Sequence, residues 1–173
     1  MEDESLFKNH LVAQGKLDYV QGTKKPKVDC ILCEIIKGSD KVEKLTVYQD
    51  NLALICLNLY PYNPGHLMIL PIRHITDFRE FTDEEILHIM NLVKKCEDLL
   101  TELYHPTGFN LGINQGEYSG ASIAHLHFHL LPRFRSELGY IDIIGKTRVV
   151  VEGIYSVYEK INQIAPKYFN IKK

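Results

Sequence analysis

Three histidines alternate with apolar residues over residues 125–131, which read His-Leu-His-Phe-His-Leu-Leu. Side chains two apart on a β-strand point to the same side, so such a strand places His125, His127 and His129 along one face. The apolar residues between them then face the core. An imidazole serves as a metal ligand, a general acid or base, or a nucleophile. Each ring also carries a donor and an acceptor that burial leaves to be satisfied. We therefore predict a chemical site here rather than an accidental histidine-rich edge strand.

A glycine-containing loop precedes the histidines. The pattern predicts a strand over residues 109–114, then a loop over residues 115–122. Glycines allow a backbone to bring its N–H groups close to a phosphate. Taken alone, the glycines fit an ordinary hairpin connection equally well, but their place before the histidines favours phosphate binding. The loop contains two glycines and two serines: Gly116, Gly120, Ser119 and Ser122.

A second candidate site is the pair Cys30 and Cys33, spaced Cys-x-x-Cys. This spacing is typical of half a zinc site. It also fits a redox pair or two buried thiols, although the polar segment before Cys30 offers no βαβ context for a thioredoxin-like motif. The other half of a zinc site has to come from elsewhere in the chain. Cys56 and Cys96 lie in apolar patterns and are predicted to be core residues.

Several of these motifs together resemble the HIT (histidine triad) superfamily of nucleotide hydrolases and transferases. The resemblance covers roughly residues 28–135. Its central feature is His-x-His-x-His followed by two apolar residues. The other matching motifs are Asn58, Pro64-Gly65-His66 with the strand after it, Arg73-His74-Ile75, and the pair Cys30 and Cys33.

The resemblance implies roles for individual residues. It assigns His127 as the nucleophile that attacks an α-phosphorus and forms a nucleotidyl-histidine intermediate. It implies that His129 and His66 hold phosphate oxygens or orient the ring of His127. The implied substrate contacts, to phosphates or to the ribose and base, are Asn58, Asn114, Gly120, Ser122 and His129.

The resemblance also implies the missing half of the metal site. In zinc-bearing HIT proteins the positions of His74 and His125 complete a tetrahedron with the two cysteines, here Cys30 and Cys33. Such a closed site is structural, and it would tie the N-terminal segment to the histidine strand. An empty or partly oxidised site is the alternative.

The implied function is cleavage of dinucleoside polyphosphates such as diadenosine tetraphosphate, by hydrolysis or phosphorolysis, in a homodimer. Hydrolases resembling the fragile histidine triad protein have Gly-Gln where this chain has Gly120-Ala121, which puts hydrolysis of that kind in doubt. Residues 139–152, with the basic pair Lys146 and Arg148, resemble diadenosine tetraphosphate phosphorylases. An adenosine phosphoramidase and a non-catalytic nucleotide-binding regulator are the alternatives.

Composition narrows the setting. A chain of 173 residues with 45% hydrophobic and 24% charged residues is typical of one globular domain. A net charge of −2 gives no argument for a nucleic-acid or membrane partner. The acidic start Met-Glu-Asp-Glu does not resemble a signal peptide, no stretch has the length of a membrane span, and four cysteines fit reduced thiols. We therefore expect a cytoplasmic protein.

Patterning predicts an α+β fold, with an antiparallel sheet, one long helix and a C-terminal helix. Expected strands cover residues 46–49, 51–57 and 66–70. Thr82 and Glu85 form a capping box for an amphipathic helix over residues 83–104. The last helix is expected over residues 152–164, ending before Pro166. Residues 1–27 are expected to be an extension and linker, with a short helix over 5–14. Residues 28–173 are expected to be a HIT domain with a C-terminal extension.

Overall fold

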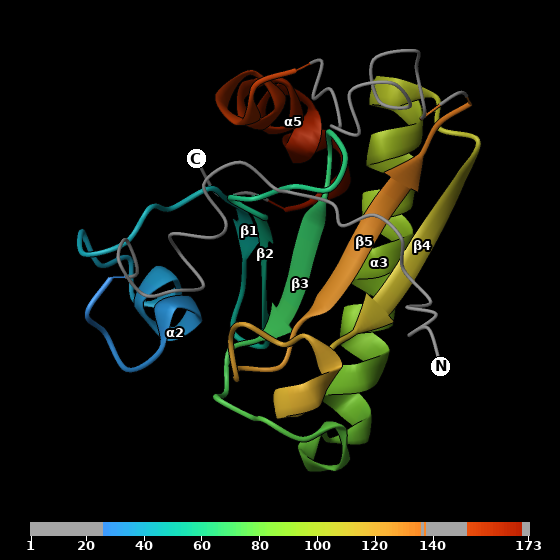
Figure 1. Cartoon of the computed structure of the whole chain (residues 1–173). Helices are drawn as coiled ribbons and strands as arrows, with labels where there is room; N and C mark the ends of the chain where they lie inside the picture. Colours follow the sequence, from blue (N-terminus) through green and yellow to red (C-terminus); the bar gives the residue numbers. More distant parts are fainter. Residues whose placement is uncertain (1–25, 136, 138–151, 171–173) are drawn as a thin grey trace, which may run out of the picture.

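One five-stranded antiparallel sheet organises the chain. The computed structural model describes residues 26–135, 137 and 152–170. The strands lie in the order β1-β2-β3-β5-β4 (Figure 1). Their bounds are β1 (Thr46–Gln49), β2 (Ala53–Leu57), β3 (Leu67–Pro71), β4 (Gly108–Ile113) and β5 (Phe128–Arg133). The helices are α2 (Ile31–Ile36), α3 (Asp83–Tyr104) and α5 (Ile154–Tyr168), with two 3₁₀ turns, η1 (Phe78–Glu80) and η2 (Glu117–Ser119). The predicted α+β class is confirmed.

The two faces of the sheet bury different partners. Every residue of β2 and β3 is buried, and successive side chains alternate between the faces. One face packs against α3 and α5 through Ile55, Ile69 and Leu130. Figure 1 shows α3 behind the sheet and α5 toward the upper ends of β1 and β2. The other face packs against the short helix α2 and contains Met68. His129 is the cross-strand partner of Met68, so the imidazole lies on the α2 face while Leu130 fills the α3 side.

The long helix α3 has the bounds that the sequence predicts. Thr82 caps it: its hydroxyl accepts from the Glu85 N–H, and the Glu85 carboxylate accepts from the Thr82 N–H (2.9 Å). The same carboxylate receives Arg73, with Nε and Nη2 at 2.8 and 2.9 Å from its two oxygens. A guanidinium that donates twice to one carboxylate fixes both groups in the plane of the pair. The helix start therefore anchors the segment that follows β3.

The histidine strand is shorter than predicted. β5 begins at Phe128, so His125 and His127 precede the sheet. The Leu126 N–H donates to the carbonyl of Ile75 (2.8 Å), and the His125 carbonyl accepts from the His127 ring (2.7 Å). These backbone groups are used outside the ladder, and the strand cannot extend through them.

The predicted end of the C-terminal helix is wrong. α5 runs to Tyr168 with Pro166 inside it. A proline lacks the N–H that its helical turn needs, and it usually ends a helix. Here Pro166 lies in the last turn on the exposed side, while Ala165 and Phe169 on either side are buried against the core. Burial of these neighbours offsets the one lost hydrogen bond.

The turn before β3 depends on Gly65. Its φ is +83°, in the left-handed region that glycine enters without a steric penalty. A Cβ at this position would lie 2.9 Å from Leu100 Cδ2 and 3.3 Å from Pro132 Cγ. Glycine therefore lets the turn approach α3 and β5 closely and delivers His66 to the start of β3.

Some expectations lie outside the described residues. They are the helix over residues 5–14, the linker up to residue 25, and the basic pair Lys146 and Arg148. The division into an extension over 1–27 and a domain over 28–173 stays a prediction. Among the described residues no helix is long and apolar enough to cross a membrane.

Candidate functional site

Four side chains from three distant segments converge on one point. Cys30 and Cys33 come from the start of α2, His74 from the segment after β3, and His125 from the segment before β5. Their ligand atoms all lie within 4.8 Å of one another. The distances from Cys33 Sγ are 3.1 Å to His74 Nδ1 and 3.5 Å to His125 Nδ1, and Cys30 Sγ lies 3.7 Å from His125 Nδ1. We call these four residues the metal cluster.

The cluster fits a tetrahedral zinc ion. Zinc–sulfur and zinc–nitrogen bonds of about 2.3 and 2.0–2.1 Å place adjacent sulfur and nitrogen ligands about 3.5 Å apart. Burial, followed by the hydrogen bond and charge of Cys30, raises the pKa of the Cys33 thiol to about 11. A thiol is a metal ligand only as thiolate, so a bound cation would displace its proton. The donor set of two thiols and two imidazoles is therefore able to hold a metal ion.

The ring of His125 is oriented for this role by the backbone. Its Nε2 lies 3.0 Å from the carbonyl of Pro71, which can only accept a hydrogen bond, so Nε2 carries the proton. Nδ1 then keeps its lone pair and faces the thiols. Burial lowers the pKa of His125 to about 4, which keeps the ring neutral. A backbone partner of this kind is the usual way in which proteins fix the tautomer of a ligating histidine.

His127 has the opposite tautomer. Its Nδ1 lies 2.7 Å from the carbonyl of His125 and donates to it, so the lone pair resides on Nε2. The side chain is 4% exposed, and burial lowers the pKa of the ring. A neutral imidazole with a lone pair on Nε2 is the form that can act as a nucleophile.

A chain of hydrogen bonds orients His129. The Tyr62 N–H donates to His66 Nδ1 (3.3 Å), which leaves the proton of a neutral His66 on Nε2. His66 Nε2 lies 2.9 Å from His129 Nδ1 and donates to it. The proton of His129 is then on Nε2. His66 is fully buried, and its contact with His129 places it where it can position that ring.

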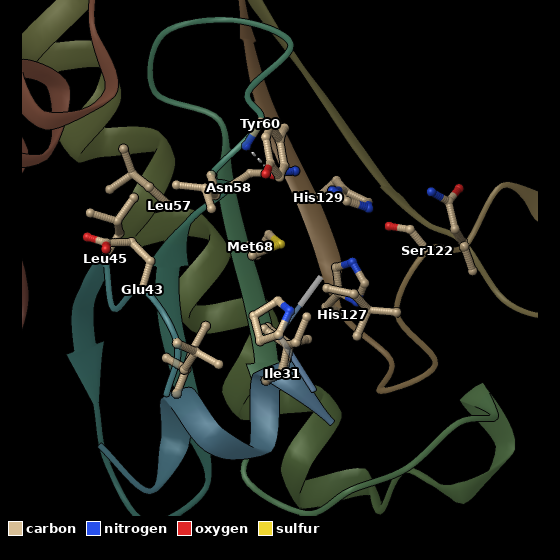
Figure 2. A pocket seen from close by; sticks show the side chains of 18 of the residues that line it. Ile31, Glu43, Leu45, Leu57, Asn58, Tyr60, Met68, Ser122, His127 and His129 are labelled. Carbon is tan, nitrogen blue, oxygen red and sulfur yellow. Dashed lines mark hydrogen bonds between the residues drawn. The ribbon is translucent and has the colours of Figure 1, made fainter. Parts of the chain in front are cut away.

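His127 and His129 border a cavity between α2, the sheet and the glycine loop. Figure 2 shows Leu45 and Leu57 toward one end and His127, His129 and Ser122 toward the other. We call this cavity the nucleotide pocket. All expected substrate contacts line it: Asn58, Asn114, Gly120, Ser122 and His129. One end therefore offers apolar surface and the other offers hydrogen-bonding groups.

Asn58 sits between the two ends of the nucleotide pocket. Its side-chain oxygen accepts from the Tyr60 N–H (3.0 Å), shown dashed in Figure 2. This bond fixes the amide group and leaves its nitrogen with two N–H donors. Asn58 follows β2 directly, and its own N–H donates to the carbonyl of His66. The side chain thus has a defined direction beside the histidines.

Two glycines of the loop over residues 115–122 have left-handed backbone conformations. Gly116 and Gly120 have φ values of +87° and +84°, which disfavour other residues. Between them lies η2, and the Ser119 hydroxyl donates to the carbonyl of Gly116 (2.8 Å). The Gln115 side chain accepts from the Phe78 N–H (2.9 Å) and connects the loop to η1.

Several positioning groups lack a sequence signal. The Pro71 carbonyl and the Tyr62 N–H are backbone groups, so no residue type marks them. The Tyr62 ring also stacks on His66, with centroids 5.2 Å apart and planes 18° from parallel. The contact of Arg73 with Glu85 joins two recognised motifs, but their pairing becomes visible only in the fold.

Fold and site together define a histidine-triad protein, because alternate histidines of one segment serve the cluster and the pocket on the same sheet face. The chain belongs to the HIT domain family, which matches residues 39–136, more than half of its length. It is 41% identical over 118 residues to "AP-4-A phosphorylase" of Mycobacterium tuberculosis, a match that covers 68% of this chain and 60% of that protein.

Two further comparisons extend this result. "Adenosine 5'-monophosphoramidase hnt1" of Schizosaccharomyces pombe is 32% identical over 112 residues, covering 65% of this chain and 80% of that protein. The crystal structure of a Zn-bound histidine triad family protein from Mycobacterium smegmatis has a TM-score of 0.66 at 20% identity, and covers 80% of this chain and 94% of that one. The latter shows a common fold.

Proposed function

We propose that this chain cleaves dinucleoside polyphosphates such as diadenosine tetraphosphate through a nucleotidyl intermediate on His127. The observation that carries the proposal is the 2.7 Å hydrogen bond from His127 Nδ1 to the His125 carbonyl. It leaves the Nε2 lone pair for attack in a pocket with an apolar end and a polar end. A base suits the apolar end, and phosphates suit the histidine end.

The first step transfers a nucleotidyl group. The Nε2 lone pair of His127 attacks the α-phosphorus, and the bond to the bridging oxygen breaks, so that ATP leaves from diadenosine tetraphosphate. The ring becomes positively charged, and the His125 carbonyl stabilises that charge through Nδ1–H. His129, with its proton on Nε2, donates to a phosphate oxygen. Asn114 and Ser122 line the same end of the pocket and offer further contacts.

The second step depends on the acceptor. An oxygen of inorganic phosphate attacks the same phosphorus, the bond to Nε2 breaks, and ADP forms. Water in the same place gives AMP. The name of the relative that is 41% identical supports phosphate as the acceptor. So does Ala121, which stands where related hydrolases have a glutamine.

The test is incubation of the purified protein with diadenosine tetraphosphate, with and without inorganic phosphate, followed by chromatography. ADP plus ATP that form only with phosphate support phosphorolysis. AMP plus ATP, or ADP alone, without phosphate means hydrolysis. No turnover in either condition contradicts the proposal.

A second candidate is an adenosine phosphoramidase, favoured by the relative of that name at 32% identity. It uses the same attack by His127 but requires one phosphorus joined to nitrogen. Turnover of an adenosine phosphoramidate without turnover of the tetraphosphate identifies it. A non-catalytic regulator is the third possibility: His127→Ala would then leave the biological activity unchanged.

We also propose a structural zinc ion in the metal cluster. Four protein ligands leave no open position, so the ion acts as a cross-link between α2 and the segment before β5. The ligand distances and the Zn-bound family member support this assignment. A reducing compartment such as the cytoplasm keeps both thiols available. The test is zinc content per chain in protein purified without added metal.

A homodimer is the proposed assembly, with two sheets joined across a two-fold axis. Its support is β4, which is the terminal strand of the described sheet and has exposed residues Asn110, Leu111 and Gly112. Leu111 is 44% exposed. Proteins rarely leave such an edge open, because it invites pairing. Sedimentation of the chain and of Leu111→Asp tests this: a monomer in both samples contradicts the dimer.

A further inference from the structure

A second cavity adjoins the nucleotide pocket. The two share one wall, formed by Ile31, Ala121, Ser122 and Ile123. From that wall the second cavity extends between the start of α2, the segment after β3 and the glycine loop, where Asp29, Thr76 and Glu117 line it. Three residues of the metal cluster, Cys30, His74 and His125, border the same space. Nothing in the nucleotidyl transfer described above uses this space.

The shared wall lies at the phosphate end of the nucleotide pocket. Leu45 and Leu57 lie toward the opposite end, and Ser122 lies beside His127 and His129 (Figure 2). A nucleotide with its base among the leucines directs its phosphates toward Ser122. A dinucleoside polyphosphate continues beyond its reacting phosphorus with more phosphates and a second nucleoside. That remainder reaches the wall from which the second cavity opens.

The charges of the second cavity disfavour phosphate. Its described lining residues include three carboxylates, of Asp29, Asp77 and Glu117, and neither lysine nor arginine. Asp77 is already paired with Arg79, at 2.9 Å to Nε and 2.6 Å to Nη2. The other two carboxylates repel an anion, but they accept hydrogen bonds from hydroxyl and amino groups. Ile31 and Ile123 add apolar surface.

We propose that the second cavity binds the nucleoside of the leaving group, the half of a dinucleoside polyphosphate that is not transferred to His127. Its ribose hydroxyls and base amino group donate to the carboxylates, and its base packs on the isoleucines. The phosphates remain over the glycine loop, between the two cavities. This inference rests on the proposed cleavage of dinucleoside polyphosphates.

The experiment compares two substrates that differ only in this nucleoside. Diadenosine tetraphosphate has it, and adenosine 5′-tetraphosphate lacks it. Both present the same adenosine and phosphates to the nucleotide pocket. The variant is Thr76→Phe, which fills the second cavity; the Thr76 N–H that bonds to Glu80 is unaffected by the side chain. Thr101→Phe on the exposed side of α3 is the matched control.

For Thr76→Phe we expect the KM of diadenosine tetraphosphate to rise about tenfold while that of adenosine 5′-tetraphosphate stays within about twofold. Thr101→Phe should change neither. In His127→Ala, which cannot turn over, the dinucleotide should bind more tightly than adenosine 5′-tetraphosphate, and adding Thr76→Phe should remove the difference. Zinc content confirms that the nearby metal cluster is intact.

Two outcomes overturn the subsite alone. Either both substrates are cleaved and Thr76→Phe raises neither KM, or it raises both equally, as general damage to the site would. If the unsubstituted protein cleaves neither substrate, the proposed function itself is overturned, and the subsite is overturned with it.

Discussion

The metal cluster contains His125 and the nucleotide pocket contains His127, which lies only two residues further along the chain. The two imidazoles are nevertheless protonated on opposite nitrogens. In His125 the proton is on Nε2, held by the Pro71 carbonyl, and Nδ1 faces the thiols. In His127 the proton is on Nδ1, held by the His125 carbonyl, and Nε2 keeps its lone pair. A backbone acceptor next to each ring therefore decides which of its nitrogens keeps the lone pair.

His125 connects the two regions. His125 contributes its ring to the metal cluster and its carbonyl to the tautomer of His127. The segment is not yet part of the sheet at this point, so its position depends on the cluster and on bonds such as that of Leu126 to Ile75. Loss of the proposed zinc ion should therefore affect His127, the proposed nucleophile, whereas loss of the His127 ring should not affect zinc binding.

The largest expected effect comes from His127→Ala. Removal of the nucleophile should lower kcat/KM on the order of 10⁴-fold or more. Zinc content and the thermal unfolding midpoint should stay close to those of the unsubstituted protein, because the ring is not part of the cluster. Retention of even a tenth of the activity would contradict a covalent role for His127.

Cys33→Ser tests the connection from the other side. We expect the variant to bind little zinc, to unfold at a lower temperature, and to lose about 10- to 100-fold in activity, as ligand-shell changes commonly do. Cys96→Ala is the control, since this buried thiol lies on α3 away from the cluster and its loss should leave zinc content unchanged. A zinc-free Cys33→Ser with full activity would show that the two regions are independent.

Substitutions of His66 test whether this residue positions His129 or contacts the substrate itself. His66→Ala removes the donor to His129, and we expect kcat to fall by about 10²-fold with a smaller change in KM, since a misplaced group costs this much. His66→Gln retains an N–H at similar reach and should restore part of kcat. The ¹⁵N shifts of His129 report the tautomer directly. If both variants raise KM and leave kcat alone, His66 is a binding residue instead.

The sequence predicts the helices, strands and motifs of this site better than it predicts the long-range contacts between them. The capping box of α3 and the alternation around His129 follow from local spacing, and both are present in the structure. The predicted end of α5 was wrong because burial of Phe169 overrides the local effect of Pro166. Long-range contacts follow from no local rule.

The histidines show the same limit. Their spacing identifies them, and their tautomers depend on carbonyls brought from other segments, as Pro71 is brought to His125. The resemblance to a known family supplied His74 as a partner of the cysteines, which spacing alone could not. The contact between His66 and His129 could not be predicted without the register of β3 against β5, because the two strands are far apart in the sequence.

The smallest expected effect concerns the ion pair of Glu85 with Arg73, which lies next to His74 of the metal cluster in the sequence. The hydrogen bond from Arg73 is the main cause that lowers the pKa of Glu85 from its usual 4.5 to about 2. The folded protein then binds fewer protons than the unfolded chain between these values. The carboxylate contributes its full stability above pH 4.5, and that contribution is lost as the pH falls toward 2.

Glu85→Gln should therefore lower the unfolding midpoint by about 3 °C at pH 7, with a difference that shrinks below pH 4.5. Glu84→Gln, an exposed change in the same helical turn, should show a smaller difference at pH 7. The residue next to Arg73 is His74, so weaker zinc retention in Glu85→Gln, at unchanged KM, would place this ion pair with the metal cluster. A raised KM with normal zinc retention would instead connect the ion pair of Arg73 and Glu85 to the nucleotide pocket. The segment after β3 would then belong with the pocket instead of the metal cluster.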